Sequence, residues 1–374
     1  MIDISLFKYA EDLTNDLEII LIIKGFNQLA ITEKIIARKG DRSHGLTAID
    51  NAALRKYSSG VIARLALSSS SITEQHLDSA IWRVDCLEPF DADICNSTFA
   101  FATGSEVQIG REMSDVRIIK YDWMSFIHTV EFSEDCSNIL ISSAGFDTII
   151  ECNLETGEAI WEWNAWDHGF NQSATEMKFI TRRPKEASVF AKQYGENNVL
   201  YVRNPADLPA EGIATSLSPV RINGASYGMN NTILATCYHR PELFLIYRDG
   251  SFKTVDLELK HPHSFQQVRF NGKGRYWVTD SGHGRILILN DDFTIIESLD
   301  FTNLSADEMK RKTFGEWIQT SSLLHLVDRD ISISVDTLRS GLHIVDITNK
   351  QRKFIKYPQD WTVQTVIPLM KDAS

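Results

Sequence analysis

Histidines are the residues of this sequence with the clearest capacity for chemistry. The segment KHPHSFQQVRF places His261 and His263 on either side of Pro262, and His128 and His168 occur elsewhere in the chain. An imidazole group can transfer a proton, attack as a nucleophile or bind a metal ion. Because proline fixes its own φ and favours an extended residue before it, we expect both rings to be held in place. Of the two, His263 is nearer to the following strand, so we expect its ring to be the one that points into a functional site.

Two kinds of catalysis are consistent with His128, His168 and His263 as catalytic residues. Acid–base or covalent catalysis needs an imidazole of adjusted pKa in a pocket that restricts water. A divalent metal ion would need three or more converging His or carboxylate ligands, and these three histidines are the candidates. The sequence contains no HExxH, P-loop, GxSxG or Rossmann motif, so no particular cofactor is predicted. Each histidine alone could instead cap a strand or fill a channel.

Composition and charge limit the partners and the compartment. The net charge of −12 argues against a nucleic-acid partner. The longest apolar run, LEIILII, is too short to cross a membrane, and no apolar leader is seen. Five cysteines, odd in number and without a CxxC pair, fit reduced thiols. We therefore expect a cytoplasmic protein without a nucleic-acid or membrane partner; the oligomeric state is not indicated.

A repeated strand–turn–strand pattern indicates how the histidines are positioned. Its third apolar position falls at 101, 141, 190, 235, 278 and 333. Intervals of roughly 40 to 55 residues with several short strands each are typical of a β-propeller. The copies are FAFATGSEVQIG, ILISSAGFDTIIECNL, SVFAKQYGENNVLYV, TILATCYHRPELFLIY, YWVTDSGHGRILIL and ISISVDTLRSGLHIVDI.

A second repeat marks the innermost strand of each blade. FIHTVEF, WIQTSSL and WTVQTVIPL share an apolar residue, then His or Gln, then Thr, and SFQQVRF is a looser copy. This alignment places His128, Gln266, Gln319 and Gln364 at equivalent positions. Inner strands near 92, 128, 175, 223, 266, 319 and 364 predict seven blades, with six as the alternative.

The last inner-strand copy is followed by almost no chain, so the final blade must be completed from the N-terminus. The strand-like segments LEIILIIKG, NQLAITEKIIA and GVIARLAL could supply it, and closure would remove exposed strand edges. We expect one all-β domain over 1–374. Residues 1–80 would complete the last blade and include a loop or short helix at 68–80, and 81–374 would form the repeated blades. A polar insertion at 302–317 begins with a helical turn capped by Ser305.

Loops that enter the inner strands are expected to form an axial funnel with aromatic walls and a polar floor. Arg285, with Arg240 and Arg339 at similar turn positions, is a candidate anion-binding residue. The expected ligand-binding residues of the funnel, beside the three histidines above, are His261, Gln266, Gln319, Gln364, Asn171, Trp123, Trp317, Trp361 and Arg285.

Two blades resemble known propellers. Residues 128–170 carry a D…E…TG…W.W blade end followed by a His-containing loop, and this stretch resembles arylsulfotransferase propellers. HPHSFQQVRFNGKGRYWVTDSGHGRILIL is similar to blades of that group and of NHL-type propellers. In arylsulfotransferases a channel histidine carries the sulfuryl group, and His128, His168 and His263 match by position. That family is typically exported and disulfide-bearing, and the channel glutamines here differ from its cationic site.

The sequence thus predicts a small-molecule enzyme of the transferase or lyase/cyclase class. Channel histidines would perform acid–base or covalent group transfer, elimination or cyclisation in a biosynthetic pathway. The alternative is a non-catalytic propeller scaffold that binds a protein partner through its top face. A fold alone does not decide between the two.

Overall fold

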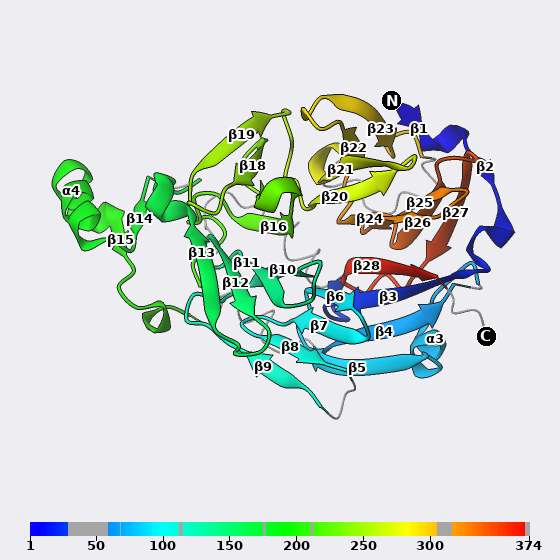
Figure 1. Ribbon diagram of the computed structural model, residues 1–374, viewed down its shortest axis with the longest axis horizontal. Coiled ribbons are helices and arrows are strands. Elements are labelled where there is room, and N and C mark those ends of the chain that lie inside the picture. The colour runs from blue at the N-terminus through cyan, green and yellow to red at the C-terminus, as the bar shows by residue number, and fades with distance from the viewer. Residues whose placement is uncertain are drawn as a thin grey trace. The chain divides into compact units, whose positions relative to one another are not determined.

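Short antiparallel strands joined by tight turns make up most of the computed structural model (Figure 1). The structure describes residues 1–28, 59–67, 69–111, 115–174, 177–209, 212–304 and 316–370. Contacts between residues divide the chain into two compact units. Unit 1 is Met1–Phe90 with Pro262–Ser374, and unit 2 is Asp91–His261. The assignment of 1–374 to a single domain stays a prediction.

Unit 2 contains, in its described residues, three four-stranded antiparallel sheets, each made from consecutive strands. The first has β6 (Asp91–Cys95), β7 (Thr98–Ala102), β8 (Val107–Gly110) and β9 (Arg117–Ile119). The second has β10 (Ile127–Phe132), β11 (Asn138–Ser143), β12 (Thr148–Asn153) and β13 (Ala159–Asn164). The third has β16 (Ile222–Tyr227), β17 (Ile233–Cys237), β18 (Glu242–Ile246) and β19 (Phe252–Asp256).

Unit 1 contains three further sheets in its described residues. The first has β20 (Phe265–Phe270), β21 (Lys273–Asp280), β22 (Arg285–Leu289), β23 (Ile295–Asp300) and β1 (Ile2–Asp3). The second has β24 (Ser321–His325), β25 (Asp330–Asp336), β26 (Gly341–Asp346), β27 (Gln351–Lys356) and β2 (Lys8–Tyr9). The third has β28 (Val363–Met370), β3 (Leu17–Ile23), β4 (Ser59–Ala66) and β5 (Trp82–Leu87). Six such sheets in the described chain define an all-β propeller of six blades.

The third sheet of unit 1 confirms the expected closure between the two ends of the chain. Strand β28 pairs antiparallel with β3, and β4 and β5 continue the sheet. Every residue of β3 is buried, because this strand lies inside the sheet with apolar neighbours on both faces. The short helix α3 (Glu74–Asp78) lies in the segment 68–80, as predicted. The segments 29–58 and 305–315, which include most of NQLAITEKIIA and the capped turn at Ser305, lie outside the described residues.

The N-terminus also extends two other blades of unit 1. Strands β1 and β2 add parallel to β23 and β27, the outermost strands of their sheets. The turn η2 (Glu11–Thr14), which follows β2, is fixed by a buried lysine of β27. Lys353 Nζ donates to Glu11 O at 2.6 Å and to Thr14 Oγ1 at 3.0 Å. Strands β1 and β2 thereby cover the outer edges of β23 and β27, which would otherwise be open to pairing.

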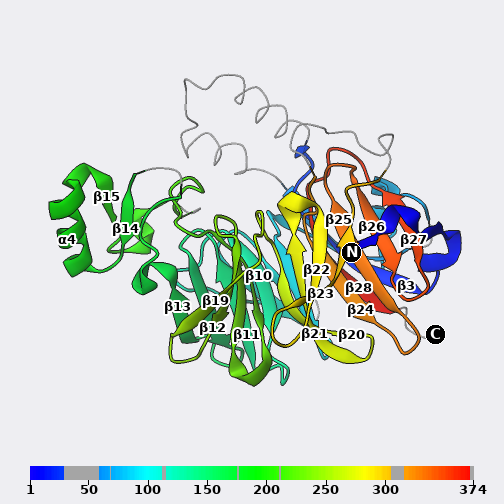
Figure 2. The ribbon, with the colours of Figure 1, turned by 90° about the horizontal axis from the view of Figure 1, so that it is seen from above.

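The seventh blade predicted from SVFAKQYGENNVLYV is wrong. Residues Pro184–Tyr194 form helix α4, and only Val199–Tyr201 is a strand, β15, which pairs parallel with β14 (Phe179–Thr181). Pro184 at the first helical turn and the run of good helix formers after it favour the helix. Figures 1 and 2 show α4, β14 and β15 beyond β13, at the outer edge of that sheet. The inner strand expected near residue 175 falls at 175–176, outside the described residues.

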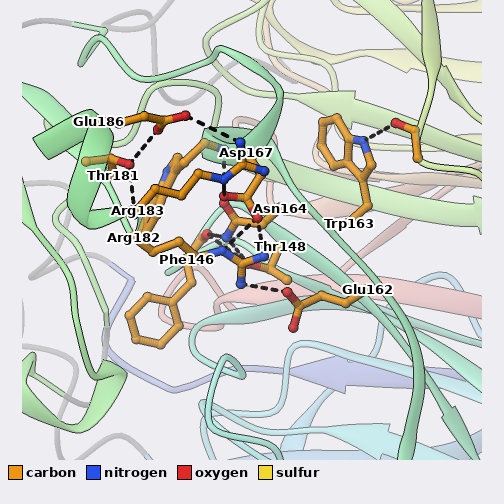
Figure 3. A network of polar contacts seen from close by, with 12 residues as sticks. Phe146, Thr148, Glu162, Trp163, Asn164, Asp167, Thr181, Arg182, Arg183 and Glu186 are labelled. Atoms are coloured by element: carbon orange, nitrogen blue, oxygen red, sulfur yellow. Dashed lines mark hydrogen bonds and ion pairs between the residues drawn. The ribbon is translucent and has the colours of Figure 1, made fainter. Parts of the chain in front are cut away.

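A network of ion pairs fastens this helical segment to its blade (Figure 3). Arg182 Nη1 lies 2.6 Å from Glu162 Oε1 of β13, and Arg182 Nε donates to Asp167 Oδ2 at 2.9 Å. Arg183 Nε lies 2.8 Å from Asp167 Oδ1. Asp167 belongs to the short helix η3 (Ala165–His168) that follows β13. Helix α4 itself has no buried residue, and it packs on β14 through the ring of Tyr194, which stacks on Phe179 at 3.9 Å. Both the ion pairs and this aromatic contact therefore hold the segment in place.

The expectation that all five cysteines are reduced is wrong for one pair. Cys95, at the end of β6, and Cys136, in the turn after β10, form a disulfide with a Cα–Cα distance of 6.0 Å. Strands β6 and β10 lie side by side, which brings these turns together although they are 41 residues apart. Cys86, Cys152 and Cys237 are free. Among the described residues, none of the helices has the length and apolar character needed to span a membrane.

Candidate functional site

A β-bulge at the start of β20 fixes the position of His263. The N–H of His263 donates to Thr279 O at 3.1 Å, while the N–H of Thr279 donates to the carbonyl of the next residue, Ser264, at 3.0 Å. Two residues of one strand thus oppose a single residue of its partner. A bulge of this kind re-aims the side chain of the extra residue, here the imidazole of His263.

The neighbouring blades of unit 1 have the same bulge. The N–H of Gln319 donates to Val335 O at 2.8 Å, and the N–H of Val335 donates to Thr320 O at 2.9 Å. The register of β28 against β3 shifts by one residue at Gln364. Thr320 Oγ1 also donates to Gln364 O at 3.0 Å, which ties the two inner strands together. Gln319 and Gln364 therefore occupy one structural position, as their sequence motif indicated.

The structure places His263, rather than Gln266, at this position of the β20 blade. Gln266 is paired with Trp277 in regular antiparallel register, three residues further along the strand. In unit 2 the register shifts at His128 of β10 and at Asn223 of β16. The sequence motif found His128 but missed Asn223, because INGASY lacks the His/Gln–Thr pair.

Two other predicted site residues, Trp317 and Gln319, lie close to His263. The Nδ1 atom of His263 lies 2.8 Å from Ser281 Oγ, and both residues are buried. The ring of Trp317 is edge-to-face with His263 at a centroid distance of 5.4 Å. Trp317 Nε1 donates to Gln319 Oε1 at 2.9 Å. Trp317 and Gln319 are only partly buried, so this cluster, which we call the His263 site, reaches the surface.

The turn between β21 and β22 holds one side of the His263 site. It is a single 3-10 turn, η7 (Ser281–His283), that ends at Gly284 with a φ of 63°. A Cβ atom on Gly284 would lie 2.6 Å from the Cβ of Glu316, so the segment that carries Trp317 packs directly on this turn. The N–H of Ile318 donates to Ser281 O at 3.3 Å. The serine is therefore placed by the same contacts that place the tryptophan.

The buried carboxylate of Asp280 holds this turn in place. Asp280 is fully buried, and its Oδ2 atom accepts from Arg285 Nε at 2.7 Å and lies 2.8 Å from His283 Nδ1. The side chain of His283 is 42% exposed, and that of Arg285 is 26% exposed. Arg285 is a predicted ligand-binding residue. Its Nε atom is bonded to Asp280, and its side chain remains partly exposed to solvent.

A second buried network holds the other side of the segment. Arg339 Nη1 donates to Asp336 Oδ2 at 2.7 Å, and Arg339 Nη2 donates to Glu316 Oε2 at 3.2 Å. His343 Nε2 lies 3.0 Å from Asp336 Oδ2. Burial opposes the ionisation of Asp336, but His343 and Arg339 outweigh it and hold the pKa of that carboxyl below its usual value. Arg339 is buried in this network and is not available as a surface anion site.

His168, Asn171 and Trp123 belong to unit 2, whereas the His263 site belongs to unit 1. The ring of His168 stacks on Trp163 at 4.9 Å, and burial lowers the pKa of its imidazole. Asn171 Nδ2 donates to two backbone carbonyls, those of Trp166 and Ile180, at 3.0 and 2.8 Å. Both contacts brace the loops after β13.

Trp123 packs in the same region, in an edge-to-face contact with Trp166 at 6.0 Å and with the Arg182 guanidinium 4.9 Å from its ring. In unit 1, Trp361 is buried and stands edge-to-face with Phe26 at 5.9 Å. Both tryptophans therefore serve packing in this structure.

His261 departs from the expected extended backbone. Its φ is +51°, in the left-handed region, although proline follows. The ring stacks on Tyr238 at 4.2 Å, and its Nδ1 atom lies 3.0 Å from Tyr238 O, and these contacts stabilise the unusual backbone. Arg240 lies over the ring of Phe170 at 5.1 Å. In the part of the chain that the structure describes, no three His, Cys, Asp or Glu side chains gather closely enough to hold a metal ion.

Solved structures resemble this chain at low sequence identity. No protein-family model and no curated protein sequence matches the chain. A protein of unknown function from Bacteroides caccae is similar over 95% of this chain and 99% of its own, with 11% identity and a TM-score of 0.50. A virginiamycin B lyase from Staphylococcus aureus aligns over 72% of this chain and 70% of its own, with 11% identity and a TM-score of 0.44. The resemblance to arylsulfotransferase and NHL-type propellers stays a prediction.

Proposed function

We propose that this chain is an enzyme that acts on a small polar molecule at the His263 site. His263 is the acid–base residue, Trp317 provides an apolar wall, and the Gln319 amide orients the ligand. The observation that carries the proposal is the linked set of contacts from Ser281 Oγ through the His263 ring to Trp317 and Gln319.

The chemistry of the contact with Ser281 supports an acid–base role. A hydrogen bond at one imidazole nitrogen sets which tautomer is present, and therefore whether the other nitrogen donates or accepts a proton. Ser281 is fully buried, so it serves as a positioning residue rather than as a nucleophile. Group transfer and elimination or cyclisation are the reaction classes that such a histidine serves.

The resemblance of two blades to arylsulfotransferases makes sulfuryl transfer the first reaction to test. The assay follows release of 4-nitrophenolate from 4-nitrophenyl sulfate, with 1-naphthol as the acceptor of the sulfuryl group. Native mass spectrometry of the purified full chain tests in parallel whether a small organic molecule is retained. We expect turnover or a retained molecule in the wild type, and at least an about tenfold loss of either in His263→Gln.

A histidine of the same unit provides the matched control. His325, at the opposite end of β24 from Gln319, is bonded to Asp330 and lies outside the His263 site. His325→Gln should keep the wild-type signal. A signal that survives in His263→Gln would refute the proposal. A wild type with neither turnover nor a retained molecule would favour the alternative, a scaffold that binds a protein partner.

A further inference from the structure

We propose that a cavity in unit 2 binds a small amphipathic anion, namely a flat apolar molecule that carries one carboxylate or sulfonate group. The cavity has a volume of about 340 Å³, within the range of small-molecule sites. It lies between the β6–β9 and β10–β13 sheets, and none of its lining residues belongs to the His263 site. The lining residues are Thr98, Ile109, Gly110, Arg111, Asp115, Arg117, Phe132, Cys136 and Leu154.

The floor of the cavity is apolar. Ile109 is the last residue but one of β8, Phe132 ends β10 and Leu154 follows β12, and all three side chains are buried. A buried apolar floor that belongs to two neighbouring sheets favours a flat hydrocarbon surface over a water cluster. The body of the ligand would rest on these three residues.

The rim of the cavity is cationic. Arg111 and Arg117 are both exposed at the mouth, and Asp115 is the acidic residue among the lining residues. Arg117 Nη1 donates to Glu155 O at 3.2 Å, which holds this guanidinium at the mouth while its other N–H groups can still bond to a ligand. With two arginines and one aspartate, the charged lining residues carry a net positive charge, which favours a ligand with an acidic group. A guanidinium group binds carboxylate and sulfonate oxygens through paired N–H donors.

One wall of the cavity is fixed covalently. Cys136 lines the cavity and is joined to Cys95 by the disulfide, and Asn96 Nδ2 donates to Cys136 Sγ at 3.1 Å. The bond ties the end of β6 to the turn after β10, so the two blades that form the cavity are held at a constant separation. A wall held in this way reduces the ordering that a ligand must impose on binding.

The test uses two fluorescent probes on the full chain. The first, 1-anilinonaphthalene-8-sulfonate, is a flat apolar anion, and the second, N-phenyl-1-naphthylamine, is its neutral counterpart without the sulfonate. We expect both to bind the wild type with saturation. Arg117→Gln and Arg111→Gln should each weaken sulfonate binding about tenfold, the loss of roughly one charge-assisted hydrogen bond, and leave binding of the neutral probe unchanged.

Two further variants make the result decisive. Thr98→Trp should fill the cavity with a large ring and abolish binding of both probes, while Arg203→Gln, an exposed arginine of the same unit outside the lining, should change neither. Circular dichroism confirms that each variant is folded. The proposal is overturned if the wild type does not saturate with the sulfonate. It is equally overturned if the arginine variants bind it as the wild type does, or if Thr98→Trp still binds both probes.

Discussion

The carboxylate of Asp91 accepts a hydrogen bond from the backbone N–H of Val130 at 3.0 Å, across the gap between inner strands β6 and β10. Two residues along, Asp93 repeats the contact with the N–H of Phe132 at 2.8 Å. The side chains of Asp91 and Asp93 thus link the β6–β9 blade to the β10–β13 blade, although the two blades belong to separate sheets. Burial raises the pKa of Asp91 to about 8 and that of Asp93 to about 6, although the backbone bonds act in the opposite direction.

These raised pKa values predict how stability depends on pH. A carboxyl group that folding keeps protonated stabilises the folded state fully only below its unfolded pKa. Stability should therefore fall as the pH rises from about 4 to about 8. Asp91→Asn keeps an acceptor for Val130 and removes the titration. We expect it to raise the free energy of unfolding by at least about 1 kcal/mol at about pH 9, and by less at about pH 5.

Urea unfolding of the wild type and the variant at the two pH values checks this prediction. Asp249→Asn is the control, because Asp249 is exposed and its pKa is lowered by Ser251 rather than raised. Equal effects of Asp91→Asn at both pH values would show that Asp91 does not titrate in this range.

Gly284→Ala should disturb the segment that carries Trp317. The alanine would need a positive φ, and its Cβ would overlap Glu316. We expect a loss of about 1–3 kcal/mol in the free energy of unfolding, together with a change in Trp317 fluorescence. Gly274→Ala, near the start of β21, meets no atom within 4 Å and should be close to neutral. Similar losses in both variants would refute the packing argument.

Arg339→Leu should destabilise unit 1 strongly, because it leaves Asp336 with a buried charge and one partner fewer. The expected loss is about 3–5 kcal/mol. Since the pKa of Asp336 is lowered by folding, its contribution is present above its ordinary pKa and is lost as the pH falls through the lowered value. The difference between variant and wild type should therefore shrink under strongly acidic conditions. The double variant Asp336→Asn with Arg339→Leu should lose less than the two single losses combined.

The disulfide predicts a redox-dependent stability. It closes a loop between residues 41 apart, for which loop entropy gives a stabilisation of about 4 kcal/mol. Cys95→Ser and Cys136→Ser should each lower the melting temperature, and a reductant should lower that of the wild type but not of the variants. Cys86→Ser, at a free thiol, is the control. Peptide mapping without reduction that finds Cys95 and Cys136 unlinked would contradict the pairing.

Several features of the site could be predicted from local pattern alone. The His/Gln–Thr motif identified His128, Gln319 and Gln364, because in these three blades the bulge at the start of the inner strand carries the same short signature. Ser281 could not be found in this way. It lies 18 residues from His263, and only the register of the β20–β21 hairpin and the turn after it brings the two together.

The sequence determined the alternating strands, the completion of the last blade by β3 and β4, and the presence of polar residues at the inner strands. These follow from side-chain periodicity and short motifs, which each segment carries within itself. The tertiary structure decided the blade count, the disulfide and the position of His263. Residues Pro184–Tyr194 overlap a predicted strand repeat but form helix α4, because their helix propensity outweighed the apparent repeat. The Cys95–Cys136 and His263–Ser281 contacts depend on register between segments far apart in the chain, and a shift of one residue in register would turn each side chain away from its partner.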